Sequence, residues 1–291
     1  MFPTLQGPAL IAPEWEAAAA DTLTRFRATR ATPPAGAVAL VASGAAGGQR
    51  LYAVADGVAI IPVGGLLVAK LGYVGWGWIT GYDGLRVQLA QAFADPEVKG
   101  IALDIDSGGG DVAGCFDLVE WAMAAKVASG KPVGAILSET AYSAAYAFAS
   151  WADSIAVPRT GGVGSIGAVC VHWDFSGMLA QQGLKPSLIA SGQHKVDGNP
   201  FQPLPEDVRL RWTATVDDLR RLFAETVARN RQAAGAALTT EQAMGTEAQC
   251  FAGPAGVAEA VRLGLADAIL SPDQAFAALV GHVNTKKEAQ G

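Results

Sequence analysis

The chain has 291 residues, of which 51% are hydrophobic and 16% are charged, and its formal net charge is −6. Such a chain can bury a sizeable core as one domain with appendages, and so few charges argue against extended disorder. The acidic balance, without a basic stripe, argues against a nucleic-acid-binding protein. The three cysteines, Cys115, Cys170 and Cys250, lack C-x-x-C spacing, so we expect no metal site, a reducing compartment and buried thiols.

Residues 1–49 are expected to form an N-terminal helical arm and a linker, with an amphipathic helix around Glu14–Arg30. The N-terminus does not show the basic region and apolar core of a signal peptide, so none is expected. The stretch Val58–Ile79 comes closest to a membrane span, but Pro62 and Lys70 interrupt it. We therefore expect no transmembrane helix.

Residues 50–270 are predicted to form the main domain, and 271–291 a C-terminal tail. Strands are expected within 50–65, 100–110, 131–140, 154–175 and 266–269, and helices within 85–96, 111–130, 141–153, 205–235 and 258–265. This alternation predicts an α/β fold with a mostly parallel sheet and right-handed crossovers. The long helix at 205–235 carries an apolar face formed by Val208, Trp212, Leu219, Phe223 and Val227.

Two segments at expected strand ends could carry chemistry. In "LDIDSGGGDVAG" a buried strand runs into three glycines before a helix, and backbone N–H groups there could hold an oxyanion. In "ETAYSAAYAFASW", Ser143 follows a strand and opens a helix, which places it at the sheet edge where α/β sites lie. Taken alone, the glycines suit a tight turn, and the serine suits a helix N-cap.

Two further segments are ambiguous by themselves. "TGGVGSIG" has the glycine spacing of a dinucleotide fingerprint, but a strand-like stretch follows it and no suitable acid lies downstream, so a Gly-rich turn is favoured and Ser165 stays unexplained. In "SGQHKVDGNPF", Lys195 could be a solvated loop lysine. His194 beside it has no clear Asp partner for a Ser–His–Asp triad.

Taken together and in this order, the segments resemble peptidase family S49, the signal peptide peptidase A family, which has the ClpP/crotonase-type fold. They are most similar to its phage-encoded capsid-assembly proteases. The resemblance runs from about Gly57 to Ala268 and is clearest in "AYSAAYAFASWADSIAVPRTGGVGSIGAV" and "SGQHKVDGNP". It implies Ser143 as nucleophile, Lys195 as general base, Ser165 as the group that orients Lys195, and the N–H groups of Gly109 and Ala144 as the oxyanion hole.

A dyad of Ser143 and Lys195 requires particular surroundings for the lysine. A lysine with a pKa near 10.4 must lose its proton to act as a base, and burial among apolar groups lowers that pKa. We therefore expect apolar surroundings for Lys195 and expect Asp197 to point away from it. The family's usual proline before the glycine pair is Gly108 here, which would loosen the turn.

The resemblance implies a serine endopeptidase acting through an acyl-enzyme, and a phage prohead maturation protease that cleaves scaffold and structural proteins. We expect a homo-oligomer in a phage procapsid of the host cytoplasm, without cofactor, metal or nucleic acid. The Gly/aromatic stretch "LGYVGWGWITGYDG" could cover the substrate or be buried in a subunit contact. The alternatives are an inactive structural assembly factor of the same fold and a crotonase-type acyl-CoA enzyme.

Overall fold

The structure is a computed structural model, and it describes residues 9–12, 15, 21, 37–40, 50–75 and 77–288. The helix expected around Glu14–Arg30 lies outside these residues except for Trp15 and Asp21, and so does Trp76 of the Gly/aromatic stretch. Within the described ranges, every helix is too short or too polar to cross a bilayer.

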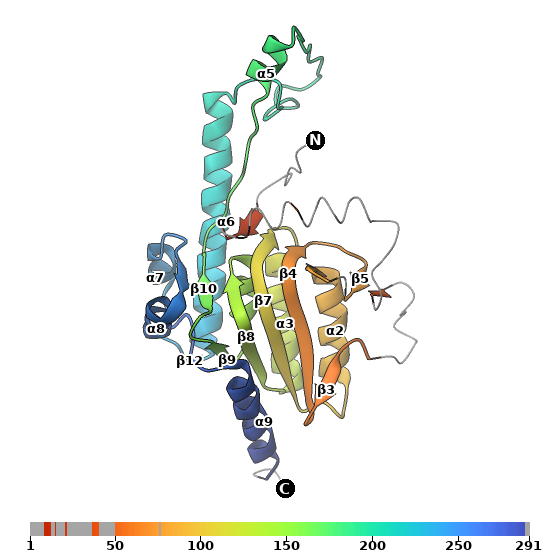
Figure 1. Cartoon of the computed structure of the whole chain (residues 1–291), viewed down its shortest axis with the longest axis vertical. Coiled ribbons are helices and arrows are strands. Elements are labelled where there is room, and N and C mark those ends of the chain that lie inside the picture. Colours follow the sequence, from red (N-terminus) through yellow and green to blue (C-terminus); the bar gives the residue numbers. More distant parts are fainter. Residues whose placement is uncertain are drawn as a thin grey trace.

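A mostly parallel sheet, to which ten strands of the described chain belong, forms the centre of the molecule (Figure 1). Its main path runs in the order β11 (Cys250–Ala252), β10 (Gly162–Gly164), β8 (Val133–Tyr142), β7 (Gly100–Asp111), β4 (Val58–Val68) and β3 (Ala53–Ala55). From β10 to β4 all neighbours are parallel, while β11 and β3 are antiparallel edge strands. The predicted α/β class with a mostly parallel sheet is confirmed.

Shorter strands complete the sheet. They are β1 (Ala9–Ile11) on β7, β6 (Ile79–Gly81) on β4, β9 (Ser154–Val157) on β8, and β12 (Ala268–Ile269) on β9. A separate ribbon pairs β2 (Val38–Ala39) with β5 (Tyr73–Val74). The sheet therefore gathers segments from nearly the whole described length, including residues near the N-terminus.

Helices cover both faces of the sheet. The larger core lies beneath α2 (Tyr82–Ala94), α3 (Cys115–Ser129), α4 (Ala144–Ala149), α6 (Glu206–Ala233) and α8 (Gly253–Arg262). On the opposite face, alternate strand residues pack against α9 (Pro272–Glu288) through Ala275, Leu279 and Val283. The segment 271–291 was expected to be a tail. Its residues Pro272–Glu288 form a packed helix instead, because these three side chains cover Val58, Ala102 and Ile136.

Local sequence features account for two turns and for the buried face of α6. The β3–β4 hairpin turns at Asp56 and Gly57, whose φ values of 50° and 78° suit a two-residue turn of type I′. Helix α3 ends at Gly130 in the left-handed conformation, with φ 67°. Of the predicted apolar face of α6, Val208, Phe223 and Val227 are buried.

Residues 168–205 form an arm that projects from the sheet (Figure 1). Helix α6 has 28 residues and is therefore about 42 Å long. The arm extends toward the N-terminal end of α6 and carries the short helix α5 (Ser176–Gln181), whereas the small helix α7 (Thr240–Gly245) packs near the C-terminal half. "AVCVHWDF" was predicted to be a strand, but it belongs to no strand of the described sheets, and only Val169 takes part in a β-bridge.

Candidate active site

Ser143 occupies a sharp turn between β8 and α4. Its backbone has φ 54° and ψ −122°, a conformation that costs a non-glycine residue free energy. Its side chain is 1% exposed, and its Oγ has no hydrogen-bond partner within the described chain. The side chain does not cap α4. Ser143 therefore holds the N-cap position of α4 without capping it. A strained, unpartnered hydroxyl at a sheet edge is a feature of functional sites.

Ser165 directly follows the neighbouring strand, β10, and lies beside Ser143. Strands β8 and β10 are parallel, and the pairs that end with Tyr142 and Gly164 bring the two serines next to each other. The Ser143 N–H donates to the Gly164 carbonyl at 2.8 Å. Ser165 also has a positive φ, 56°, and is 4% exposed. The glycine-rich segment is a strand and a turn, and no helix follows it directly, which agrees with the rejection of a dinucleotide site.

The glycines of β7 lie on the other side of Ser143. Ser107 pairs with Ala141, and this register carries Gly109 to the level of Ser143. Gly109 has φ 104°, which only glycine adopts readily. Its N–H donates to Ser107 Oγ at 3.1 Å, and that hydroxyl donates to the Gly65 carbonyl at 2.6 Å. Gly109 therefore lies where an oxyanion donor is needed, but its N–H is already engaged.

Ala144 and the nearest cysteine complete the surroundings of Ser143. Ala144 is the first residue of α4, so its N–H has no acceptor within the helix. Cys115 Sγ approaches the Ala144 carbonyl at 3.8 Å, and burial raises the pKa of this thiol to about 12. Cys115 is thus an inert core thiol. Of the three cysteines predicted to be buried, only this one is; Cys170 and Cys250 are half-buried.

Lys195 lies on the arm, and the structure does not bring it to Ser143 within one chain. It is exposed in a turn whose other side chains bind α6. There, the Asp197 carboxylate accepts hydrogen bonds from Arg211 and, at 3.0 Å, from His194. The predicted apolar surroundings of Lys195 are absent from the described single chain, because the arm projects away from the sheet (Figure 1). Asp197 is held by Arg211.

Two segments beside the carboxyl end of β7 were not predicted from the sequence to belong to the site. Ser107 looked like one polar residue in a glycine-rich turn, yet it holds the Gly109 N–H. The segment Ala9–Ala12 was assigned to a helical arm and linker, but its residues Ala9–Ile11 form β1 on β7. A signal was available for the second, because four apolar residues bounded by Pro8 and Pro13 suit a short edge strand.

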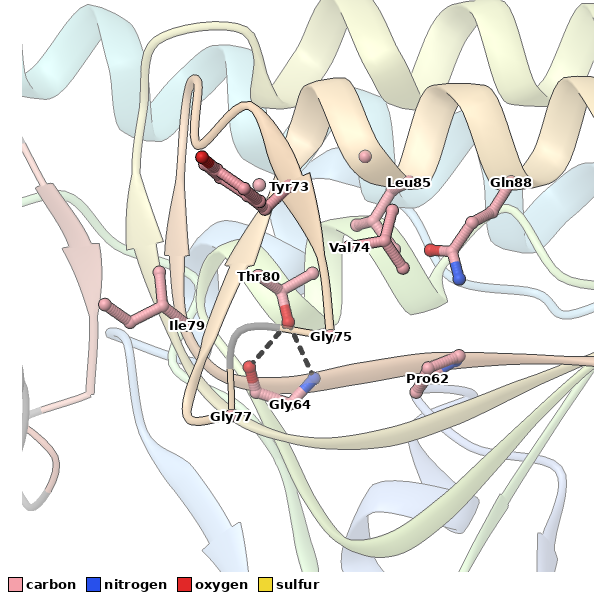
Figure 2. A pocket seen from close by; sticks show the side chains of 12 residues that line it. Pro62, Gly64, Tyr73, Val74, Gly75, Gly77, Ile79, Thr80, Leu85 and Gln88 are labelled. Carbon is pink, nitrogen blue, oxygen red and sulfur yellow. Dashed lines mark hydrogen bonds between the residues drawn. The ribbon is translucent and has the colours of Figure 1, made fainter. Parts of the chain in front are cut away.

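A small cavity of about 110 Å³ lies between the Gly/aromatic stretch and α2 (Figure 2). Thr80 Oγ1 donates to the Gly64 carbonyl at 2.8 Å and accepts from the Gly64 N–H at 3.2 Å. The cavity's other walls include Tyr73, Val74 and Leu85, and none of the predicted catalytic residues lines it. The described residues also contain no cluster of side chains suited to a metal ion.

Comparison with known proteins gives consistent matches. The model of peptidase family S49 matches residues 125–286. The chain is 41% identical over 244 residues to the head-tail preconnector protein GP5 of Enterobacteria phage P21, covering 82% of this chain and 46% of that protein. It is 37% identical over 239 residues to the capsid assembly protease C of Escherichia phage lambda, covering 82% and 52%. The chain thus spans about half the length of these curated relatives.

Among solved structures, an enoyl-CoA hydratase/isomerase family member matches with a TM-score of 0.43 and 19% identity. The match covers 80% of this chain and 74% of that one.

Proposed function

The chain belongs to peptidase family S49, and from this premise we propose that it is a serine endopeptidase that uses Ser143 as nucleophile and Lys195 as general base. Its proposed task is capsid maturation in a phage procapsid within the host cytoplasm, where it cleaves scaffold and structural proteins. The printed names of two relatives, a capsid assembly protease and a head-tail preconnector protein, support this task. No cofactor or metal takes part in the proposed reaction.

The reaction is acyl transfer. Ser143 Oγ attacks the carbonyl carbon of the scissile peptide bond while the lysine amine takes the hydroxyl proton. The C–N bond then breaks, and lysine returns the proton to the leaving amine. Water hydrolyses the resulting ester with the same base. The N–H groups of Gly109 and Ala144 would hold the oxyanion, once Gly109 is released from Ser107.

One observation carries this proposal: Ser143 is a strained, buried serine whose hydroxyl has no partner in the described chain. A structural serine would form a hydrogen bond or be replaced by glycine, because an unpaired buried polar group and a positive φ both cost stability. Ser165 beside it has the same backbone strain. Two buried serines with positive φ at the carboxyl ends of adjacent parallel strands indicate a catalytic role more than a role in packing.

We propose that Lys195 reaches the Ser143 of a neighbouring copy in a homo-oligomer. Within one chain the arm projects away from the sheet (Figure 1). Lys195 is exposed in its turn, close in sequence to Asp197, which binds Arg211 of α6. The arm also exposes Val171, Trp173 and Ile189, the last of which is 98% exposed. Exposed apolar side chains of this kind mark protein contacts. Burial in such a contact would remove water from Lys195 and lower its pKa, as a lysine base requires.

The first test compares wild type with Ser143→Ala, each incubated with an unfolded protein and with the phage capsid and scaffold proteins. We expect fragments, detected by intact-mass analysis, from wild type only, because alanine removes the attacking oxygen. Removal of a nucleophile in such enzymes lowers the rate by several orders of magnitude. Fragments from both proteins would place the nucleophile elsewhere. Fragments from neither would favour an inactive structural assembly factor, which the separation of Lys195 from Ser143 also allows.

The second test asks whether the base comes from another copy. Ser143→Ala and Lys195→Ala are each expected to be inactive alone. After co-refolding in equal amounts, mixed oligomers should regain about a quarter of the wild-type activity, because half the chains keep each group. A control mixture of Ser143→Ala with the Ser143→Ala, Lys195→Ala double variant should stay inactive. No recovery in the first mixture would mean that both groups act within one chain.

A further inference from the structure

The N-terminal segment fills a free strand edge beside Ser143. Strand β8 ends at Tyr142 and turns into α4, whereas β7 continues to Asp111. On one side Gly109 and Gly110 of β7 pair with β4. Beyond Ser143 the other side of β7 would therefore be open, and β1 occupies it, antiparallel, with Ile11 opposite Gly109 (Figure 1).

Ala12 and Trp15 fasten this segment to the glycine turn. The Ala12 N–H donates to the Gly108 carbonyl at 2.8 Å, and Ala12 is fully buried. The Trp15 side chain lies against Gly108 so closely that a Cβ there would be 2.0 Å from Trp15 Cγ. Any side chain at Gly108 would therefore displace Trp15. The glycine at this position makes room for the N-terminal segment.

We propose that β1, together with Ala12 and Trp15, is an intramolecular blocking strand that occupies the place of an extended polypeptide substrate. This inference rests on the proposed peptidase function and adds its regulation. A substrate held beside Ser143 must present its backbone to the edge that β1 now covers, because main-chain pairing is what binds an extended peptide. Since β1 belongs to the same chain, its effective concentration at the edge is on the order of millimolar.

The strand also fixes the oxyanion turn in an unproductive orientation. In a trans peptide the carbonyl and the N–H point in opposite directions. Because the Gly108 carbonyl is held by Ala12, the Gly109 N–H points away from β1 and donates to Ser107 Oγ. To face an oxyanion on the Ser143 side, this peptide must rotate and break the bond to Ala12. Release of the blocking strand would therefore open the edge and free the donor together.

The test measures binding and is independent of turnover. Full-length chains carrying Ser143→Ala are titrated with a dye-labelled peptide GPALIAPE, residues 7–14, and binding is followed by fluorescence anisotropy. Ala12→Pro removes the N–H that binds the Gly108 carbonyl. Gly108→Ala adds a methyl group where the Trp15 side chain packs, and so displaces Trp15. Both should bind the peptide about tenfold more tightly than the parent, because the internal competitor is weakened. Ala12→Gly keeps the N–H and should bind within about twofold of the parent.

Two outcomes would overturn the inference. The first is equal binding by all four chains, provided that thermal unfolding shows each to be folded. The second is equal binding of the peptide GPALIPPE, which lacks the same N–H, because pairing with β7 would then not be the mode of contact. With Ser143 restored, Ala12→Pro should form fragments about tenfold faster than Ala12→Gly. Tighter binding without Ser143-dependent fragments would uphold the blocking strand and reject the peptidase.

Discussion

At the residue scale, the backbone conformation of Ser143 and its buried hydroxyl both lower the stability of the fold. Its φ of 54° and ψ of −122° belong to a region that glycine occupies freely and other residues do not. Its hydroxyl is buried without a partner in the described chain. Both features cost free energy at a position where glycine would remove them. The residue is therefore explained by what its hydroxyl can do and not by what it contributes to folding.

This conflict predicts opposite effects of one substitution on stability and on activity. Ser143→Gly should raise the free energy of unfolding by about 1 kcal/mol relative to Ser143→Ala, because glycine relieves the backbone strain that alanine keeps. Both variants should be inactive. Urea denaturation of the two proteins at one pH measures the difference. If the glycine variant is the less stable of the two, the turn is not strained in solution.

Gly108 shows how a residue-level interpretation changes once the fold is known. From the sequence, glycine in place of the family's usual proline suggested a looser turn. In the structure the same glycine leaves the space in which Trp15 packs. The partner is 93 positions away in the sequence, so no local pattern could have indicated it.

At the scale of elements, the alternation of strands and helices was predictable because each element carries its own signal. Buried apolar runs indicated β7 and β8, and the glycine that closes the helix expected within 111–130 indicated the end of α3. Strand pairing at a distance was not predictable. β1 has three residues and pairs with a segment about 100 positions away, and so short a strand has almost no periodic signal.

The strand predicted at 168–175 is not formed, although this segment does carry a local strand signal. Its alternating apolar residues, with Val169, Val171 and Trp173 about 40% exposed, carry the period of a strand. A strand also needs a neighbour along its whole length, and among the described residues of this segment only Val169 takes part in a β-bridge. A local period therefore indicates an extended segment, but it does not indicate which segment pairs with it. For the same reason the spacing of Ser143 and Lys195 did not reveal that one chain keeps them apart.

The anchor of α6 should be strong at its C-terminal end and weak at its N-terminal end. Arg231 is fully buried, donates to Asp267 at 2.6 Å and donates to the Gly264 carbonyl at 3.0 Å. Arg231→Ala should lower the free energy of unfolding by about 3 kcal/mol, because it empties a fully buried site and removes the hydrogen bonds to Gly264 and to Asp267, whose side chain is 36% exposed. Arg209→Ala removes an exposed pair with Glu206 on the same helix and should cost less than about 0.5 kcal/mol.

Chemical denaturation monitored by tryptophan fluorescence distinguishes these two variants. Similar losses for both would mean that α6 is not fastened to the core through its C-terminal end. The expected difference matters for function, because α6 supports the arm that carries Lys195 (Figure 1). A helix fixed at one end can present that lysine to a neighbour at a defined distance from its own sheet.

At the scale of the whole molecule, the two halves of the proposed dyad lie in different environments. Ser143 is enclosed in the core, and Lys195 is exposed on a projecting arm. Most of the large hydrophobic side chains that the described chain exposes lie on or beside this arm: Val169, Val171, Trp173, Met178, Leu184, Ile189, Phe201 and Leu210. So many exposed apolar groups on one projection favour its burial against another copy.

Assembly and activity should therefore be lost together when the arm is altered. Ile189→Glu places a charge where the neighbouring copy is proposed to bind, and burying an unpaired charge costs several kcal/mol. Light scattering should show wild type as a multiple of the 29.8 kDa chain and the variant as mostly monomer, with peptidase activity reduced at least about tenfold. Val127→Glu alters an equally apolar residue, 75% exposed on α3, and should change neither property. A monomeric Ile189→Glu protein with full activity would show that Lys195 reaches Ser143 within its own chain, and the arm would then have to fold back onto the sheet.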